Sequence, residues 1–166
     1  LAILDAQQAQ IDALIMRSET SFANLQTPFT GAVARHDMIM TPLDTSTFMT
    51  WGSQVDPRYT ANIFEPGTYC FGFGYSMFLS AAGATILTGA IVIDPATGPL
   101  QSQGSQTADA LGNEPLGRQD IIIYKTTLSA SEVPAHLWLY VEQNDAPTST
   151  LTVPILSNRA WVTKLL

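Results

Sequence analysis

The chain has 166 residues, of which 46% are hydrophobic and only 13% are charged, and its formal net charge is −7. Binding to nucleic acid or to an anionic membrane surface needs clustered Lys and Arg, and the seven basic residues here are scattered, which argues against both functions. A monomer with so few charges would cover its surface poorly, so the composition predicts burial of surface between subunits, that is, an oligomer.

Residues 1–20 are predicted to form a helical coiled-coil stalk. Apolar residues recur there at the alternating three- and four-residue spacing of heptad core positions, and four alanines raise helix propensity. We expect Leu4, Ile11 and Leu14 to contact other copies of the chain. The alternative is an ordinary amphipathic helix that packs on the head, because two and a half heptads do not settle the matter.

Residues 21–30 are interpreted as a polar connector, and residues 31–166 as an all-β head. Apolar residues in the head alternate or form short runs, separated by Pro, Gly, Asp and Asn. Short strands with frequent turn signals favour a sandwich or jelly roll over a parallel α/β sheet. The predicted strands lie near residues 32–41, 47–52, 59–64, 68–76, 85–94, 120–128, 137–143, 149–155 and 159–165.

Strand 68–76 has the clearest pattern, with four large rings on one face and four small residues on the other. One interpretation places the rings in the sandwich core, and the other places part of this row at a three-fold subunit contact. Strand 120–128 is apolar on both faces, which predicts that it is covered on both sides. The candidate interface rings are Tyr69, Phe71, Phe73 and Tyr75.

Residues 95–119 are rich in Gly, Pro, Gln and Ser and contain few large apolar groups. They are predicted to form a long loop with one short strand near 106–111, which serves either as a contact surface or simply as an exposed loop.

Three segments of the head resemble the C1q/TNF-like jelly roll. They are the strand entry Phe64-Glu65-Pro66-Gly67-Thr68-Tyr69-Cys70-Phe71, the pair of late strands IIIYKTTL and HLWLYVEQND, and the terminal strand AWVTKLL. The resemblance implies a two-sheet sandwich that forms a tight trimer, as in heads of phage and viral fibres and spikes. Two features depart from the family: Val133-Pro134-Ala135-His136 replaces a common Gly-Asp pair, and the collagen-like stem is absent.

The sequence holds no catalytic motif, so we expect a non-enzymatic protein. One cysteine and the two distant histidines, His36 and His136, do not supply a zinc site, and no cofactor is expected. Calcium remains possible but unsupported, because Asp94, Asp109 and Asp120 flank loops and are more typical of solvated turns.

The predicted function is that of a homotrimeric receptor-binding head of a phage or viral fibre, located on the virion surface outside the cell. It would attach the virion to a host-surface glycan or protein. Two features make a virion more probable than a secreted eukaryotic protein: Cys70 can form no intrachain disulfide, and there is no Asn-x-Ser/Thr glycosylation sequon. Sugars stack on aromatic rings, so the candidate ligand-binding residues are Trp51, Tyr59 and Trp138.

Two alternatives stay open. The first is a structural virion protein, such as a capsid decoration or head fibre, whose partners are capsid or tail proteins. The second is a cellular C1q/TNF-like ligand. The chain starts at Leu1 rather than Met, so we expect a processed protein or a fragment of a longer fibre.

Overall fold

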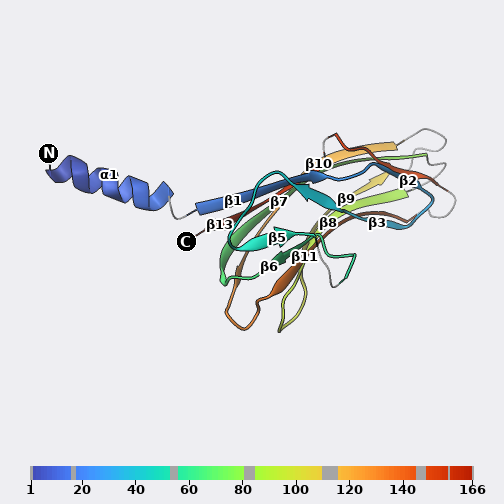
Figure 1. The fold of residues 1–166 in the computed structure, drawn as a ribbon. Helices are drawn as coiled ribbons and strands as arrows, with labels where there is room; N and C mark the ends of the chain where they lie inside the picture. The colour runs from blue at the N-terminus through green and yellow to red at the C-terminus, as the bar shows by residue number, and fades with distance from the viewer. Residues whose placement is uncertain are drawn as a thin grey trace.

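The computed structural model describes residues 2–15, 18–52, 56–80, 85–109, 116–144, 149–156 and 158–165. It consists of one helix followed by two antiparallel sheets that pack face to face (Figure 1). The all-β sandwich with a short N-terminal helix that the sequence predicts is therefore confirmed.

Helix α1 spans Ala2–Ile15, and in Figure 1 it lies apart from the sandwich. The head does not cover two of its apolar side chains, since Leu4 is 65% exposed and Ile11 is 49% exposed. The side chain of Leu14 lies outside the described residues. The helical segment is confirmed up to Ile15. No helix among the described residues has the length and apolar character needed to cross a membrane.

The predicted boundary between stalk and head is wrong, because strand β1 already begins at Ser18 and ends at Leu25. It pairs antiparallel with β13 (Arg159–Leu165), from Ser18 opposite Leu165 to Asn24 opposite Arg159. Residues 18–25 therefore belong to the head and not to a stalk or connector. The alternation was hard to see because two of the three inward side chains, Ser21 and Ala23, are small.

The first sheet, sheet A, has the order β2-β12-β7-β13-β1-β4, with β10 on the other edge of β7. The second, sheet B, has the order β5-β6-β11-β8-β9, with β3 beside β11. The further strands of sheet A are β2 (Phe29–Gly31), β4 (Met40–Pro42), β7 (Gly67–Leu79), β10 (Leu116–Leu128) and β12 (Leu151–Val153). Those of sheet B are β3 (Arg35–Asp37), β5 (Met49–Trp51), β6 (Ala61–Ile63), β8 (Thr85–Asp94), β9 (Gln101–Asp109) and β11 (Ala135–Gln143).

The core lies between the sheets and follows the two-residue period of the strands. Strand β11 alternates buried and half-buried residues along its whole length, with Leu137, Leu139 and Val141 inward. Opposite them, β7 contributes the four large rings at 69, 71, 73 and 75, each at most 1% exposed. The core interpretation of this aromatic row is thus confirmed. Its assignment to a contact between subunits is wrong, because the rings leave no surface for a second chain.

The described residues of segment 95–119 also contain more β-strand than predicted. Strand β9 occupies Gln101–Asp109, and β10 begins at Leu116 instead of residue 120. Polar residues are tolerated in β9 because it is an edge strand, paired only with β8 among the described residues.

Candidate functional site

The outer face of sheet A carries an apolar row that crosses four strands. Phe22 of β1 lies opposite Trp161 of β13, Trp161 opposite Gly72 of β7, and Gly72 opposite Ile123 of β10. A Cβ atom added to Gly72 would lie 1.9 Å from Cε2 of Trp161, so the indole rests directly on bare backbone. Phe22 is 48% exposed and Ile123 is 55% exposed. We call these four residues the apolar row.

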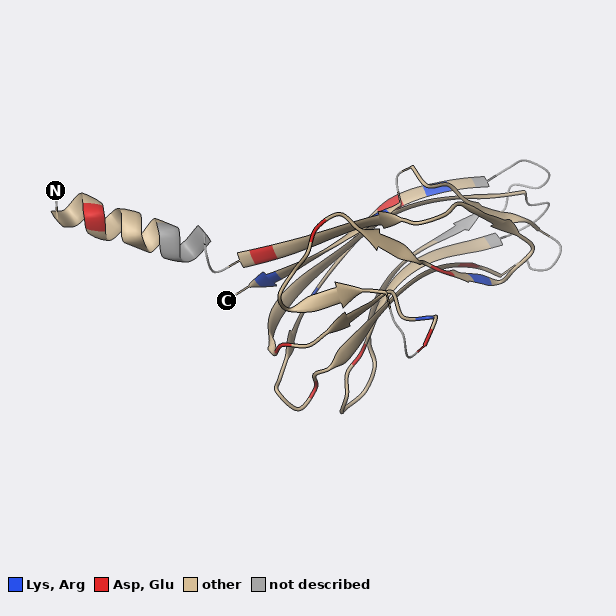
Figure 2. Cartoon of the chain, viewed as in Figure 1, with Lys and Arg blue, Asp and Glu red and all other residues tan. Residues whose placement is uncertain are grey.

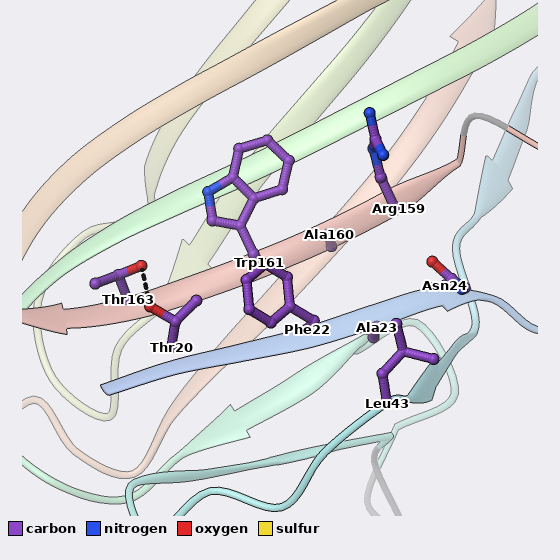
Figure 3. A pocket seen from close by; sticks show the side chains of 9 residues that line it. All are labelled: Thr20, Phe22, Ala23, Asn24, Leu43, Arg159, Ala160, Trp161 and Thr163. Carbon is purple, nitrogen blue, oxygen red and sulfur yellow. Dashed lines mark hydrogen bonds between the residues drawn. The ribbon is translucent and has the colours of Figure 1, made fainter. Parts of the chain in front are cut away.

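A shallow groove of about 570 Å³ runs beside this row. Figure 3 shows the rings of Phe22 and Trp161 together, with the hydroxyls of Thr20 and Thr163 hydrogen-bonded at 2.9 Å along one side. Arg159 stands at the other end. The groove is lined by Thr20, Phe22, Ala23, Asn24, Leu43, Arg159, Ala160, Trp161 and Thr163.

Ile121 of β10, 55% exposed, extends the apolar surface beyond the row. The prediction that strand 120–128 is covered on both sides is therefore wrong for a single chain: Ile122 is buried, but Ile121 and Ile123 face outward. Charged residues are few and scattered over the sandwich (Figure 2), and those beside this apolar surface are the basic residues Arg159 and Lys125.

The outer face of sheet B brings two of the three predicted ligand-binding rings together. The guanidinium carbon of Arg58 lies 5.9 Å from the ring centre of Tyr59 and 5.6 Å from that of Trp138. Tyr59 also stacks on His136 with 4.3 Å between ring centres. Its hydroxyl donates a hydrogen bond to Asp94, which together with burial raises the pKa of Tyr59.

Sequence reasoning missed three members of this surface: Arg58, described above, and Tyr140 and Arg35. Tyr140 packs beside Trp138 with ring centres 4.8 Å apart, and Arg35 lies over both rings. Burial, helped by the charge of nearby Glu142, raises the pKa of Tyr140. The alternation in residues 136–142 could have shown that Trp138 and Tyr140 share a face, but Arg35 arrives from a strand about a hundred residues earlier.

Trp51 lies elsewhere, at the edge where β5 meets sheet A. Its indole N–H donates to Oγ of Ser21 at 2.8 Å, and Ser21 in turn donates to Asp44 at 2.7 Å. This hydrogen-bond chain closes one side of the core. A hollow of about 280 Å³ lies next to it, lined by Ser21, Pro42, Asp44, Thr45, Ser46, Met49, Thr50 and Trp51.

The described residues contain no group of three His, Cys, Asp or Glu side chains that could hold a metal ion. His36 stacks on Phe29 at 4.0 Å between ring centres, and burial lowers its pKa in spite of the nearby charge of Asp37. Two of the aspartates considered for calcium have partners: Asp94 accepts from Tyr59, and Asp120 accepts from Arg118 at 2.7 Å. The side chain of Asp109 lies outside the described residues.

Comparison with solved structures places the sandwich among known folds. Murine APRIL at pH 5.0 superposes with a TM-score of 0.56 at 8% identity, over 89% of this chain and 99% of that one. Eiger TNF from S. frugiperda superposes with a TM-score of 0.53 at 13% identity, over 90% and 94%. The fold is a TNF-like jelly roll. No family model and no curated protein matches the sequence. At such low identity the comparison establishes the fold alone, and it confirms the jelly-roll resemblance seen in the sequence.

Proposed function

We propose that the chain is a homotrimeric, non-enzymatic attachment head that binds a receptor at a cell surface. The observation that carries this proposal is the apolar row on the outer face of sheet A. The described residues of the chain leave Phe22 and Ile123 about half exposed there, and Ile121 beside them. An apolar surface of this kind on a chain with few charges is typical of an interface.

Burial between copies would stabilise the assembly appreciably. Covering the exposed half of a large apolar side chain contributes about 1 kcal/mol, and each copy offers several such side chains. Gly72 has no side chain, so the indole of Trp161 lies directly against the sheet and the face stays flat for the approach of a second chain.

Helix α1 supports the same arrangement. Ile3, Leu4 and Ile11 are exposed in one chain, and a coiled coil between copies would cover them. The element that follows the helix along the chain is β1, which lies in sheet A and carries Phe22 of the apolar row. The resemblance to C1q/TNF-like heads implies three copies.

The finer proposal is that the head forms the tip of a phage or viral fibre on the virion surface. A helical segment before the head, a single cysteine and the lack of glycosylation sequons support it. The second candidate is an extracellular ligand of cellular origin, and the fold shared with APRIL and Eiger TNF over most of the chain favours it. Binding to bacterial cells supports the phage proposal, and binding to animal cells alone supports an animal virus or the ligand.

Light scattering of the full chain tests the trimer. We expect a mass three times that of one chain at micromolar concentration. Ile123→Asp should lower the mass, because it places a charge in the apolar row. Ile86→Asp is the matched control, since Ile86 is 40% exposed in β8 of the other sheet and should leave the mass unchanged. A single-chain mass for the native protein would overturn the proposal.

A further inference from the structure

The outer face of sheet B carries five side chains that interlock, and we call them the arginine–aromatic cluster. They are Arg35, Arg58, Tyr59, Trp138 and Tyr140. Arg35 comes from β3, the two rings at 138 and 140 come from β11, and the other two come from the turn before β6. Three segments that are far apart in the sequence therefore build one surface.

Each arginine of the cluster contacts two aromatic rings and also pairs with a carboxylate. The guanidinium of Arg35 lies 5.0 Å from the Trp138 ring centre and 4.4 Å from that of Tyr140, and it donates two hydrogen bonds to Glu142 at 3.0 and 3.2 Å. Arg58 contacts Trp138 and Tyr59 and pairs with Asp56 at 2.6 Å. These contacts fix both side chains before any ligand arrives.

The side chain of Trp138 is also held in place, because its indole N–H donates a hydrogen bond to Oδ1 of Asp37 at 2.7 Å. The cluster lies on the opposite side of β11 from the core residues Leu137, Leu139 and Val141. Its members therefore add little to the core. Cation–π contacts at partly exposed positions contribute only about 0.5–1 kcal/mol each.

The composition and rigidity of the cluster are those of a protein-binding surface. Trp, Tyr and Arg dominate the residues that carry binding energy in interfaces. Ordering a long side chain on binding costs about 0.5–1.5 kcal/mol, and a surface that is already ordered avoids much of this cost. Beside the rings, Ala90 of β8 lies opposite Tyr140 and is only 4% exposed, and Gly104 of β9 lies opposite Ala90.

We propose that the arginine–aromatic cluster is the receptor contact of the head, and that the receptor is a folded protein that presents lysine or arginine side chains. The inference rests on the proposed attachment function and names its surface and partner chemistry. Four carboxylates surround the two guanidiniums, so the surface has an excess of negative charge, as does the whole chain at −7. The four carboxylates belong to Asp37, Asp56, Asp94 and Glu142.

A protein partner fits this surface better than a sugar does. A sugar ring would stack on an open aromatic face, but Arg35 already covers the rings of Trp138 and Tyr140. The groove on the outer face of sheet A and the hollow beside Trp51 both lie elsewhere. Recognition would therefore use a broad flat contact with salt-sensitive pairs at its rim.

Binding of the fluorescently labelled full chain to a panel of intact bacterial and animal cells tests the inference. We expect Trp138→Ala and Tyr140→Ala each to weaken binding by about thirtyfold or more, the loss expected of a central interface residue. Neither substitution changes the charge of the surface, and both side chains lie on the outer face of β11, away from the core. Leu100→Ala is the control, because it shortens a side chain that is 62% exposed and belongs neither to the cluster nor to the apolar row. The mass of every variant is measured alongside.

Treatment of the cells separates the possible partners. Protease treatment should abolish binding, glycosidase treatment should leave it intact, and added salt should weaken it. Loss of binding with glycosidase but not with protease would make the receptor a glycan and overturn the inference. Native binding that persists in both cluster variants at unchanged mass would also overturn it, while the attachment function stands. A native protein that binds no cell in the panel would refute the attachment function itself.

Discussion

Replacing Gly89 by alanine tests how closely the two sheets pack. Gly89 lies in β8, opposite Val141 of β11 and Ser105 of β9. An added Cβ atom would lie 2.2 Å from Cε1 of Tyr75 and 2.4 Å from its Cζ. Carbon atoms in contact are normally about 3.5–4.0 Å apart, so the ring of Tyr75 would have to move by at least about 1.3 Å.

The ring has little room to move. Tyr75 is fully buried, its ring centre lies 5.4 Å from that of Phe73, and its hydroxyl is within 3.5 Å of the carbonyl oxygen of Ser105. Inserting a group into a well-packed core costs about 1–3 kcal/mol. Alanine also restricts the unfolded chain, which returns at most about 1 kcal/mol. We therefore expect Gly89→Ala to lower the free energy of unfolding by about 1 kcal/mol, and by up to about 2.5 kcal/mol if the ring of Tyr75 cannot move.

Gly104→Ala is the matched control, one strand away in β9. Its Cβ atom would meet the carbonyl oxygen of Gly89 at 3.5 Å and Cγ2 of Thr88 at 3.9 Å, which are ordinary contacts. This variant should be neutral or more stable by up to about 1 kcal/mol. Urea unfolding at a fixed chain concentration measures both, because the stability of an oligomer depends on concentration.

A double-mutant cycle identifies the cause. If the clash with Tyr75 is responsible, Gly89→Ala should cost much less in a Tyr75→Val background than in the native protein. A Gly89→Ala variant as stable as the native protein, or a Gly104→Ala variant that is equally damaged, would refute the reasoning.

Three other substitutions test contacts elsewhere. Ser21→Ala removes the hydroxyl that accepts a hydrogen bond from the Trp51 indole and donates one to Asp44. It should lower the free energy of unfolding, measured in urea, by about 1–3 kcal/mol, and an unchanged midpoint would contradict this. Burial raises the pKa of Tyr69 from 10.0 to about 12, so the unfolded chain ionises first and about 3 kcal/mol of stability should be lost between pH 10 and 12. Tyr69→Phe should remove that loss, and an unaltered alkaline profile would refute it. Burial lowers the pKa of His36 below 6.5, so the unfolded chain binds the proton first and stability should fall as pH decreases below 6.5. His36→Phe should flatten this slope, which the same unfolding assay at several pH values measures.

Hydrophobic alternation was enough to predict the fold class, because most of the core comes from strands with large inward side chains. Strands β7 and β11 are of this kind, and both lie where the sequence places them, with small shifts at their ends. Strand β1 was missed because its inward residues include Ser21 and Ala23, whose burial depends on pairing with β13, far along the chain. Strand β9 was predicted only in part, as a short strand near 106–111, because at an edge its pattern is mostly polar.

The candidate surfaces were harder to predict, because they depend on contacts between distant segments. Arg58 contacts both Tyr59 and Trp138 only because the turn before β6 lies against β11, and β6 pairs there only at Ala61–Ile63. The sequence singled out both rings without showing that they meet, and it grouped with them Trp51, which closes the core at another edge. The outward row of β7 was noticed for its small residues, but the role of Gly72 became clear only with Trp161 lying on it.

The two outer faces of the sandwich have opposite chemistry, and this difference supports a division of roles. Sheet A presents exposed apolar side chains, which water solvates poorly and a second copy of the chain would cover well. Sheet B presents aromatic rings whose faces are occupied by guanidiniums paired with carboxylates, and such a surface remains hydrated until a complementary partner arrives. If sheet A faces the three-fold axis, each trimer displays sheet B three times on its outside. Three weak contacts would then act together, which is how an attachment head of modest single-site affinity can hold a cell.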